Sequence, residues 1–371
     1  MVSFELSEEQ ALLRDTCRDF ALTIMRKQDR PADESGEIPA DIIKQGHELG
    51  LTTGYIPEAY GGAGGQLSAL DSVIVLEELA YGNLSMTVNI LAPSLMNIPL
   101  MLYGTEEQKK KYFTMNKPDQ FQGFTAALVE PSVRFDIESL KTTAADDGDD
   151  FVLNGEKAFV SIADSALATL VFAKKGSGEG LAGIDGFIVP AGGFTVKERE
   201  KNQGLRALKQ FTLSLDGSRV ARNEVLKLSG VLKLSGGFAN LLARARTASI
   251  ALTTGVCRAA YEYALAYAKE RIAFGEPIAS RQSVAFTLAE MAMEIDAIRL
   301  MAWKSAWMLD KGMDAYKEAS LGKRYAADTA MFITRNATQI LGGHGFVREH
   351  PVEMWYRDAR SFAVSEFMAI V

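Results

Sequence analysis

A block of short β-rich runs between two long helical regions is the feature that most limits how this 371-residue chain can fold. Up to about residue 120, apolar residues recur with the helical period, and "SEEQ" at Ser7 and "TEEQ" at Thr105 have the form of capping boxes, which begin helices. From about 121 to 228, β-branched and aromatic runs alternate with turn residues, and the Asn-Gly pair in "FVLNGEKAFVS" predicts a tight turn. Long amphipathic helices then follow almost to residue 371.

This order predicts a mostly α protein with a central β domain, because segregated helices and strands form separate packed layers rather than a doubly wound sheet. We expect an N-terminal helical domain at 1–120, a central β domain at 121–228 and a C-terminal helical bundle at 229–371. The segment "SMTVNILAPSLMNIPLML" (85–102) is apolar, but its Asn and Pro residues predict a buried helix rather than a membrane span.

The composition excludes several classes of function. A net charge of -7 argues against nucleic acid or an anionic membrane as the main partner. Two cysteines, Cys17 and Cys257, and three histidines predict neither a disulfide framework nor a metal cluster. The acidic opening "MVSFELSEEQ" is unlike a signal peptide, so we expect a reducing, cytoplasmic compartment.

Glu366 stands out near the end of the chain. It is the only charged residue from Ser361 to Val371, and most of its neighbours there are apolar. A carboxylate in apolar surroundings is costly unless it is paired, and its pKa tends to rise. Glu366 is therefore either a tuned proton acceptor or a solvated residue on a frayed end, and the local sequence alone leaves both open.

Five motifs and one spacing give the chain a resemblance to a known family. In order they are "YIPEAYGGAGG", "AALVEPSVRFD", "LNGEKAFVS", "YAKERIAFGEPIASRQ" and "QILGGHGFVREHPVEMWYRDAR", with Glu366 nine residues after Arg357. The chain resembles the acyl-CoA dehydrogenases over nearly its whole length, most specifically in the last two motifs. The resemblance implies the same three-part fold, a non-covalent FAD, a tetramer built as a dimer of dimers, and an electron-transferring flavoprotein as electron acceptor.

The resemblance also implies a reaction. In this family a glutamate removes the α-proton of an acyl-CoA thioester while the β-hydrogen leaves as hydride to the flavin N5, and a flavin hydroxyl and the glutamate's own N–H bind the thioester carbonyl. Glu366 matches that base, and Arg246 matches an arginine that orders the site and contacts substrate. Ala245 stands at the family's second possible base position, so no competing carboxylate is expected there.

Two groups of cofactor and substrate residues follow from the same resemblance. The first is expected to hold the pyrophosphate and adenine of FAD across a dimer interface, and consists of Arg271, Phe274, Gln282, Gln339, Gly342 and Gly343. The second is expected to line the isoalloxazine ring and the pantetheine arm of the same subunit. Its cofactor contacts are Leu128, Val129, Phe159 and Ser161, and its substrate contacts are Phe135, Ala243 and Arg246.

The second group departs from the family pattern. Val129 replaces a threonine, Phe159 a tryptophan, and Ala243 an aspartate that serves the CoA arm. Arg134-Phe135 and Phe367-Met368 replace a Gly-Ser and a Gly-Thr pair. Three readings stay open: a self-sufficient FAD dehydrogenase, an accessory subunit that completes the FAD site of a homologous partner, and the same chemistry on an unusual or carrier-protein-bound acyl group.

Overall fold

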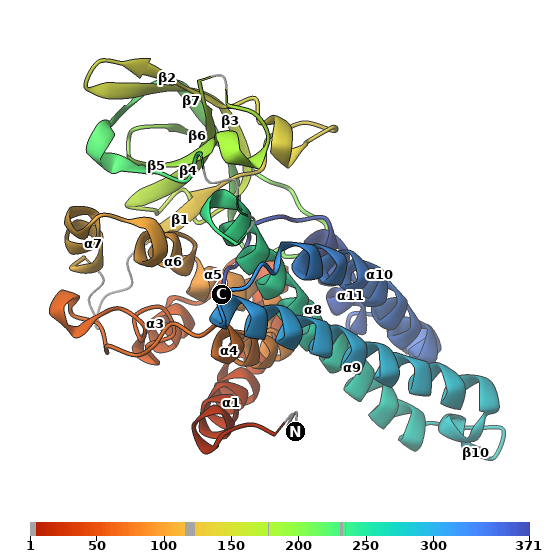
Figure 1. The fold of residues 1–371 in the computed structure, drawn as a ribbon. Coiled ribbons are helices and arrows are strands. Elements are labelled where there is room, and N and C mark those ends of the chain that lie inside the picture. The colour runs from red at the N-terminus through yellow and green to blue at the C-terminus, as the bar shows by residue number, and fades with distance from the viewer. Residues whose placement is uncertain (1–4, 116–122, 177, 231–232, 234) are drawn as a thin grey trace.

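The computed structural model describes residues 5–115, 123–176, 178–230, 233 and 235–371, and has helices, then strands, then helices (Figure 1). The predicted boundary between residues 120 and 121 lies outside the described residues. The first helical region contains α1 (Glu8–Phe20), α2 (Asp29–Ser35), α3 (Ala40–Glu48), α4 (Ala69–Gly82), α5 (Leu84–Leu91), α6 (Ser94–Tyr103) and α7 (Glu106–Phe113). Ser7 and Thr105 form the two predicted capping boxes, and each accepts a hydrogen bond from the backbone N–H of the Gln three residues later.

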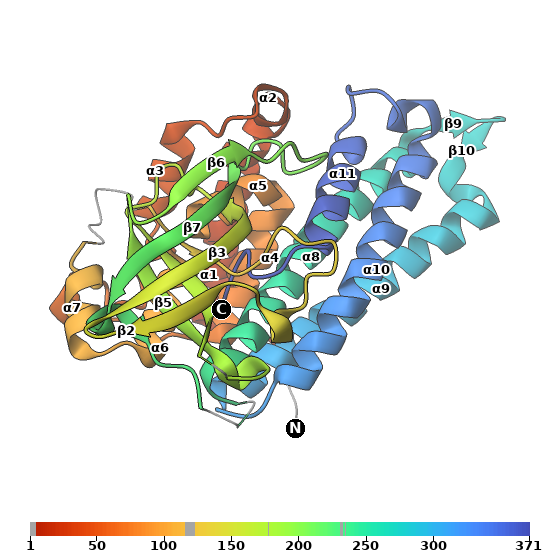
Figure 2. The same cartoon turned by 90° about the horizontal axis from the view of Figure 1, so that it is seen from above.

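The middle region forms one twisted sheet above the N-terminal helices (Figures 1 and 2). Its strands are β1 (Phe124–Ala127), β2 (Thr143–Asp147), β3 (Asp150–Ser161), β4 (Ala168–Lys175), β5 (Ile184–Pro190), β6 (Thr195–Arg199), β7 (Gln210–Ala221) and β8 (Val225–Leu226). The strand order is β6-β7-β3-β2-β4-β5-β8, with β1 pairing parallel to β4. The prediction of a mostly α protein with a central β domain is confirmed, while the exact domain boundaries stay a prediction.

The predicted turn at Asn154-Gly155 is wrong. β3 runs through these residues as a single 12-residue strand, and its pairing with β7 shifts register between Leu153 and Gly155. Gly155 has φ 148, and a Cβ there would lie 2.6 Å from the Thr142 hydroxyl oxygen. The pair therefore makes a β-bulge, in which glycine allows close approach of a neighbouring strand.

The last region is a helical bundle built on one long central helix. It contains α8 (Gly237–Glu270), the short hairpin β9 (Ile272–Ala273) and β10 (Glu276–Pro277), α9 (Gln282–Asp310), α10 (Tyr316–Leu341) and α11 (Val352–Ala363). Residues along α8 are buried against α4, α9 and α10. The packing of α8 on α4 is tight, because a Cβ at Gly255 would lie 2.3 Å from the Glu77 carbonyl oxygen.

The apolar segment 85–102 is buried, as predicted, but as two helices. α5 and α6 meet at a bend of 42°, beside Pro93, and their residues lie in the protein core. Among the described residues, no single helix has the length and apolar character needed to cross a membrane, although this bent pair meets that test by length and composition.

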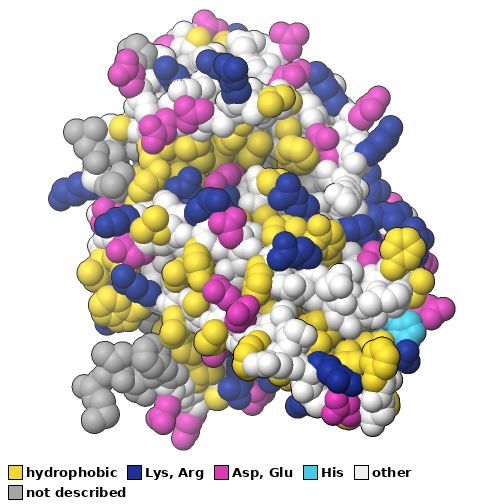
Figure 3. Space-filling model, turned by 90° about the vertical axis from the view of Figure 1, so that its right-hand side faces the viewer, with side chains coloured by type: hydrophobic (Ala, Val, Ile, Leu, Met, Phe, Trp, Pro, Cys, Tyr) yellow, Lys and Arg dark blue, Asp and Glu magenta, His cyan; other side chains and the backbone are white. Residues whose placement is uncertain are grey.

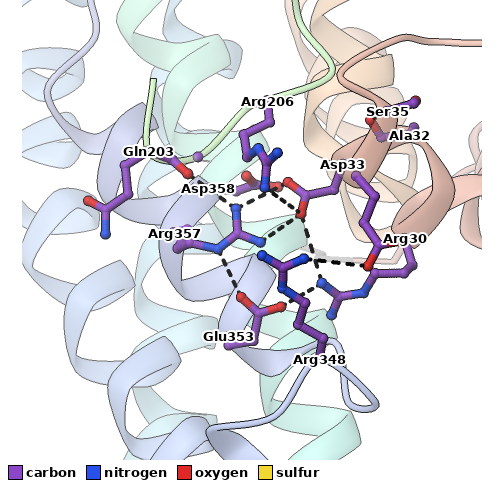
Figure 4. Close-up of polar contacts among 12 residues, drawn as sticks. Arg30, Ala32, Asp33, Ser35, Gln203, Arg206, Arg348, Glu353, Arg357 and Asp358 are labelled. Atoms are coloured by element: carbon purple, nitrogen blue, oxygen red, sulfur yellow. Dashed lines mark hydrogen bonds and ion pairs between the residues drawn. The ribbon is translucent and has the colours of Figure 1, made fainter. Parts of the chain in front are cut away.

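An ion network joins all three regions (Figure 4). Arg357 on α11 pairs with Asp33 on α2 at 2.7 Å, and Glu353 on α11 accepts from Arg30 at 2.6 Å. Asp358 accepts from the backbone N–H of Leu205, in the loop between β6 and β7, at 2.6 Å. Burial raises the pKa of the Asp358 carboxyl to about 7. These contacts fix the direction of α11, the helix that leads to Glu366.

Candidate active site

Glu366 follows the end of α11 and is mostly buried between α8 and α10. Its Oε1 lies 2.6 Å from the Lys323 ammonium and 3.7 Å from the Arg246 guanidinium. Its Oε2 is buried and makes no hydrogen bond within the described part of the chain. The solvated-end alternative is wrong for this residue, because one carboxylate oxygen is ion-paired and the other is shielded from water.

The two cations near Glu366 come from different helices. Arg246 on α8 donates to the Ser320 hydroxyl at 2.7 Å, and its guanidinium stacks 5.3 Å from the centre of the Tyr316 ring. Arg246 is mostly buried, with 15% of its side chain exposed. Its predicted position beside Glu366 agrees with the structure, which also reveals a closer cation.

Lys323 is the residue that the sequence analysis missed. It lies on α10 on the same face as Tyr316 and Ser320, and it donates both to Glu366 and, at 2.5 Å, to the Ser365 carbonyl oxygen. Burial lowers the pKa of the Lys323 ammonium, while the Glu366 carboxylate opposes this shift. The spacing Tyr316, Ser320, Lys323 is a helical stripe, and its polarity on a buried face could have drawn attention to it.

Phe367 and Met368, which replace Gly-Thr of the family, turn inward. Phe367 is buried and packs edge-on against Phe172 of β4, with ring centres 4.9 Å apart. Its φ of 56 lies in the left-handed region, which is unfavourable for a bulky residue and is easily adopted by glycine. The Met368 sulfur lies 3.9 Å from the Gln210 amide nitrogen. The backbone beside Glu366 therefore keeps a glycine-like conformation while carrying a large side chain.

The predicted isoalloxazine contacts lie together at one edge of the β domain. Leu128 and Val129 follow β1, while Phe159 and Ser161 lie at the end of β3, next to them through the Ala158-to-Val129 backbone hydrogen bond of 2.8 Å. Ser161 is buried, whereas Phe159 is 44% exposed and has φ 56. An exposed aromatic in a strained backbone conformation is consistent with a side chain kept for contact with a ligand.

A buried ion pair holds this edge. The Lys157 ammonium is fully buried and donates to the Leu128 carbonyl and to Glu130 Oε1, both at 3.0 Å. Burial raises the pKa of the Glu130 carboxyl, but Lys157 and the N–H groups of Lys141 and Thr142 outweigh this and leave its pKa below the usual value. Glu130 and Lys157 are a second pair that the sequence analysis did not single out.

The predicted substrate contacts Phe135 and Ala243 differ in their accessibility. Phe135 is half-buried and packs against the core between the sheet and the helices, while Val133 beside it is fully exposed. Ala243 is buried in the helical core. Phe135 thus lies at a surface that a ligand can reach, whereas Ala243 offers no exposed contact in this structure.

The residues predicted for the pyrophosphate and adenine lie at the opposite end of the bundle. Arg271 caps the C-terminal end of α8, Gln282 begins α9, and Gln339 lies in the last turn of α10. The Tyr267 hydroxyl and His344 Nδ1, 2.9 Å apart, join the end of α8 to the turn after α10. A Cβ at Gly342 or Gly343 would meet no atom within 4 Å, so both glycines face open space.

The structure therefore gathers the predicted pyrophosphate and adenine contacts at one end of the bundle, and the predicted isoalloxazine contacts at one edge of the β domain. Arg246 lies on α8 and Arg271 is its C-cap, 25 residues further along the chain. At about 1.5 Å of rise per residue, the two positions are about 37 Å apart along the helix axis. The predicted substrate contact Arg246 and the predicted pyrophosphate contact Arg271 therefore lie far apart along one helix.

Comparison with known proteins decides the family. Profiles described as the N-terminal, middle and C-terminal domains of acyl-CoA dehydrogenase match residues 7–115, 125–218 and 238–366. The chain belongs to the acyl-CoA dehydrogenase family. Its oxidoreductase relatives include the bovine mitochondrial short-chain specific acyl-CoA dehydrogenase (Bos taurus), which is 36% identical over 98% of this chain and 88% of its own length.

Other members of the acyl-CoA dehydrogenase family are comparably similar. CarC, a subunit of the caffeyl-CoA reductase-Etf complex of Acetobacterium woodii, is 33% identical over 97% of this chain and 95% of its own. Butyryl-CoA dehydrogenase from Megasphaera elsdenii has a TM-score of 0.86 at 29% identity, covering 100% and 96% of the two chains. The prolyl acyl carrier protein oxidase AnaB has a TM-score of 0.84 at 26% identity, covering 99% of this chain and 96% of its own.

Proposed function

We propose that this protein catalyses FAD-dependent α,β-dehydrogenation of an acyl thioester, with Glu366 as the base that removes the α-proton. The observation that supports this most directly is the asymmetry of the Glu366 carboxylate. One oxygen is ion-paired with Lys323, and the other is buried without a hydrogen-bond partner in the described residues. A general base needs an oxygen that is free to take a proton, and Oε2 is such an oxygen.

The surroundings of Glu366 suit this task. An α-proton beside a thioester is only weakly acidic, so its removal needs a shielded base and hydrogen-bond donors for the carbonyl oxygen, where negative charge develops. Ala245 is fully buried at the family's second base position, so it brings no competing carboxylate. The Glu366 backbone N–H is the chain's own candidate donor to the thioester carbonyl.

The residues present fit FAD as the cofactor. Arg271 suits a diphosphate because a guanidinium donates to two oxygens at once, and the exposed Gln282 and Gln339 add amide groups at the same end of the bundle. Gly342 and Gly343 leave room for a ligand to approach the backbone. Bound FAD supplies the acceptor for the hydride that leaves the β-carbon.

The separation of the two groups supports an oligomer. If Arg271, Gln282 and Gln339 of one chain complete the FAD site of another, two-fold symmetry gives each interface two complete sites. Apolar side chains are exposed on these elements: Phe274 of the hairpin is 97% exposed, and Phe346 after α10 is 89% exposed. Figure 3 shows hydrophobic side chains spread among charged ones on this side of the molecule. We propose a homo-oligomer, assembled as a dimer of dimers.

We propose an electron-transferring flavoprotein as the electron acceptor. We also propose that the reaction takes place in the cytoplasm. CarC belongs by its name to a complex with such a flavoprotein, and this chain aligns with nearly all of CarC. We therefore include this partner in the proposal.

Two alternatives have specific support. The bulk of Phe367 in a glycine-like conformation supports an accessory subunit with an eroded pocket, which would complete the FAD site of a homologous partner. The similarity to AnaB, an oxidase of a carrier-protein thioester, and the exposed loop at Val133 and Arg134 support a carrier-bound or unusual acyl group. The self-sufficient enzyme is our leading proposal because Glu366 and Ser161 are both present, with Ser161 buried and Glu366 mostly buried.

Anaerobic photometry tests the function. Butyryl-CoA and octanoyl-CoA should bleach the flavin absorbance, but the acyl-CoA concentration at half-saturation should be in the millimolar range. The reason is that each hydrogen bond lost at Phe135 and Ala243 weakens CoA binding by about 0.5–1.5 kcal/mol. The same acyl group on a phosphopantetheinylated carrier protein tests the carrier alternative. Bleaching at micromolar acyl-CoA would show that the replacements at Phe135 and Ala243 do not weaken CoA binding. No bleaching by any thioester would contradict the proposed function.

A further inference from the structure

We propose that Lys323 is a positioning residue for the reaction, which holds Glu366 by its side chain and its backbone at the same time. This inference rests on the proposed role of Glu366 as the base. Lys323 Nζ lies 2.6 Å from Glu366 Oε1 and donates to the Ser365 carbonyl at 2.5 Å. One ammonium therefore contacts two groups on either side of a single peptide bond.

The backbone contact has a directional consequence. In a trans peptide the C=O and N–H groups point in opposite directions from the same plane. The Ser365 carbonyl and the Glu366 N–H belong to one peptide group, so holding the carbonyl toward Lys323 directs the Glu366 N–H away from Lys323. A donor to the thioester carbonyl must be fixed before charge develops, because reorientation during the reaction costs free energy.

The side-chain contact decides which oxygen acts as the base. Lys323 engages Oε1, so the carboxylate is anchored with Oε2 free. In the described residues, the charged groups that face Glu366 are Lys323 from α10 and Arg246 from α8. Arg246 is farther away and is held by Ser320 and Tyr316, so it supplies positive charge without fixing the carboxylate.

Lys323 is itself fixed by the packing of α10. Its neighbour Gly322 lies against Ile250 of α8, where a Cβ would meet the Ile250 Cδ1 at 2.5 Å. A side chain at 322 would therefore require Ile250 to shift, so the small residue next to Lys323 permits close packing of α10 on α8. The lysine is thus placed by a close helix contact, as a precise positioning role requires.

Lys323→Met tests this role, since Met has similar length but neither charge nor donors. We expect the maximal rate of anaerobic flavin reduction by butyryl-CoA to fall at least tenfold, while the half-saturation concentration changes less than threefold. The acid limb of the pH–rate profile should move to higher pH, because loss of the cation disfavours the Glu366 carboxylate. K323R, which keeps the charge, should leave the acid limb near that of the wild type. K304M, which removes the exposed Lys304 ammonium and its pair with Glu318, is the matched control and should change nothing.

A substrate-free measurement covers the case in which K323M folds poorly. Urea unfolding of K323M, E366Q and K323M/E366Q should show that the two changes affect the free energy of unfolding in a coupled way. The stability lost in K323M should be largely recovered in the double variant, because the Glu366 carboxylate that K323M leaves buried and unpaired is absent there. Additive effects, or an unchanged acid limb and rate in K323M, would overturn the inference. If E366Q itself reduces flavin normally, the proposed function fails instead, so the two failures are distinguishable.

Discussion

Replacing Glu366 with Gln should slow anaerobic flavin reduction by an acyl thioester by about 10²–10⁴-fold, the usual contribution of a positioned general base. Gln has nearly the same shape and can still accept from Lys323, so folding and bound FAD should be retained. What it lacks is the ability to take a proton at Oε2, the oxygen that is buried without a partner in the described residues. Stopped-flow absorbance of the flavin measures the rate.

Two comparisons make the Glu366 experiment decisive. E318Q changes another α10 carboxylate, which pairs with Lys304 at 3.7 Å away from the site, and should reduce flavin at the wild-type rate. The released flavin per chain should be equal in E366Q, E318Q and wild type, which shows that any loss of rate is chemical. A wild-type rate in flavin-loaded E366Q would exclude Glu366 as the base.

The second large effect concerns Lys157. Lys157→Met leaves the Glu130 carboxylate buried beside a methyl-terminated chain, and breaking a buried pair by removing one partner costs about 3–5 kcal/mol. It also removes the donor to the Leu128 carbonyl, which holds the strand end next to the predicted isoalloxazine contacts. We therefore expect a large loss in the free energy of unfolding and weaker binding of FAD.

A neighbouring ion pair supplies the control for Lys157. Lys197 pairs with Glu156 on the same sheet, but the two side chains are 44% and 42% exposed. Exposed pairs contribute at most about 1 kcal/mol, so K197M should be close to wild type in urea unfolding. The double variant E130Q/K157M should recover part of the loss, because the uncompensated charge is removed. A K157M protein as stable as K197M would mean that the buried pair does not hold this edge.

Local signals in the sequence were sufficient for much of the fold. The capping boxes at Ser7 and Thr105 could be predicted because all their partners lie within three residues. The turn at Asn154-Gly155 was wrongly predicted because the same two residues suit a hairpin turn and a bulge, and only the neighbouring Thr142 decides between them. Local chemistry therefore identifies the glycine, while tertiary contacts determine how it is used.

The candidate site was predictable only where a motif carried it. Glu366 and Arg246 were found through the family motifs, and the structure places them 3.7 Å apart. Lys323 and Lys157 were missed because each is a lysine in an unremarkable helical or strand pattern, whose partner lies far along the chain. The consequence of the Gly-to-Phe change at Phe367 also needed the structure, which shows the left-handed φ that the new side chain retains.

The amount of FAD released per chain tests the central proposal most directly. In a homo-oligomer where each chain lends Arg271, Gln282 and Gln339 to its neighbour, every chain also receives those residues, so each should hold one flavin. Denaturing the purified protein and measuring released FAD against chain concentration should give a ratio near one. A colourless protein that FAD cannot reconstitute, yet which restores flavin binding to a co-expressed complete homologue, would contradict the self-sufficient enzyme and establish the accessory subunit in its place.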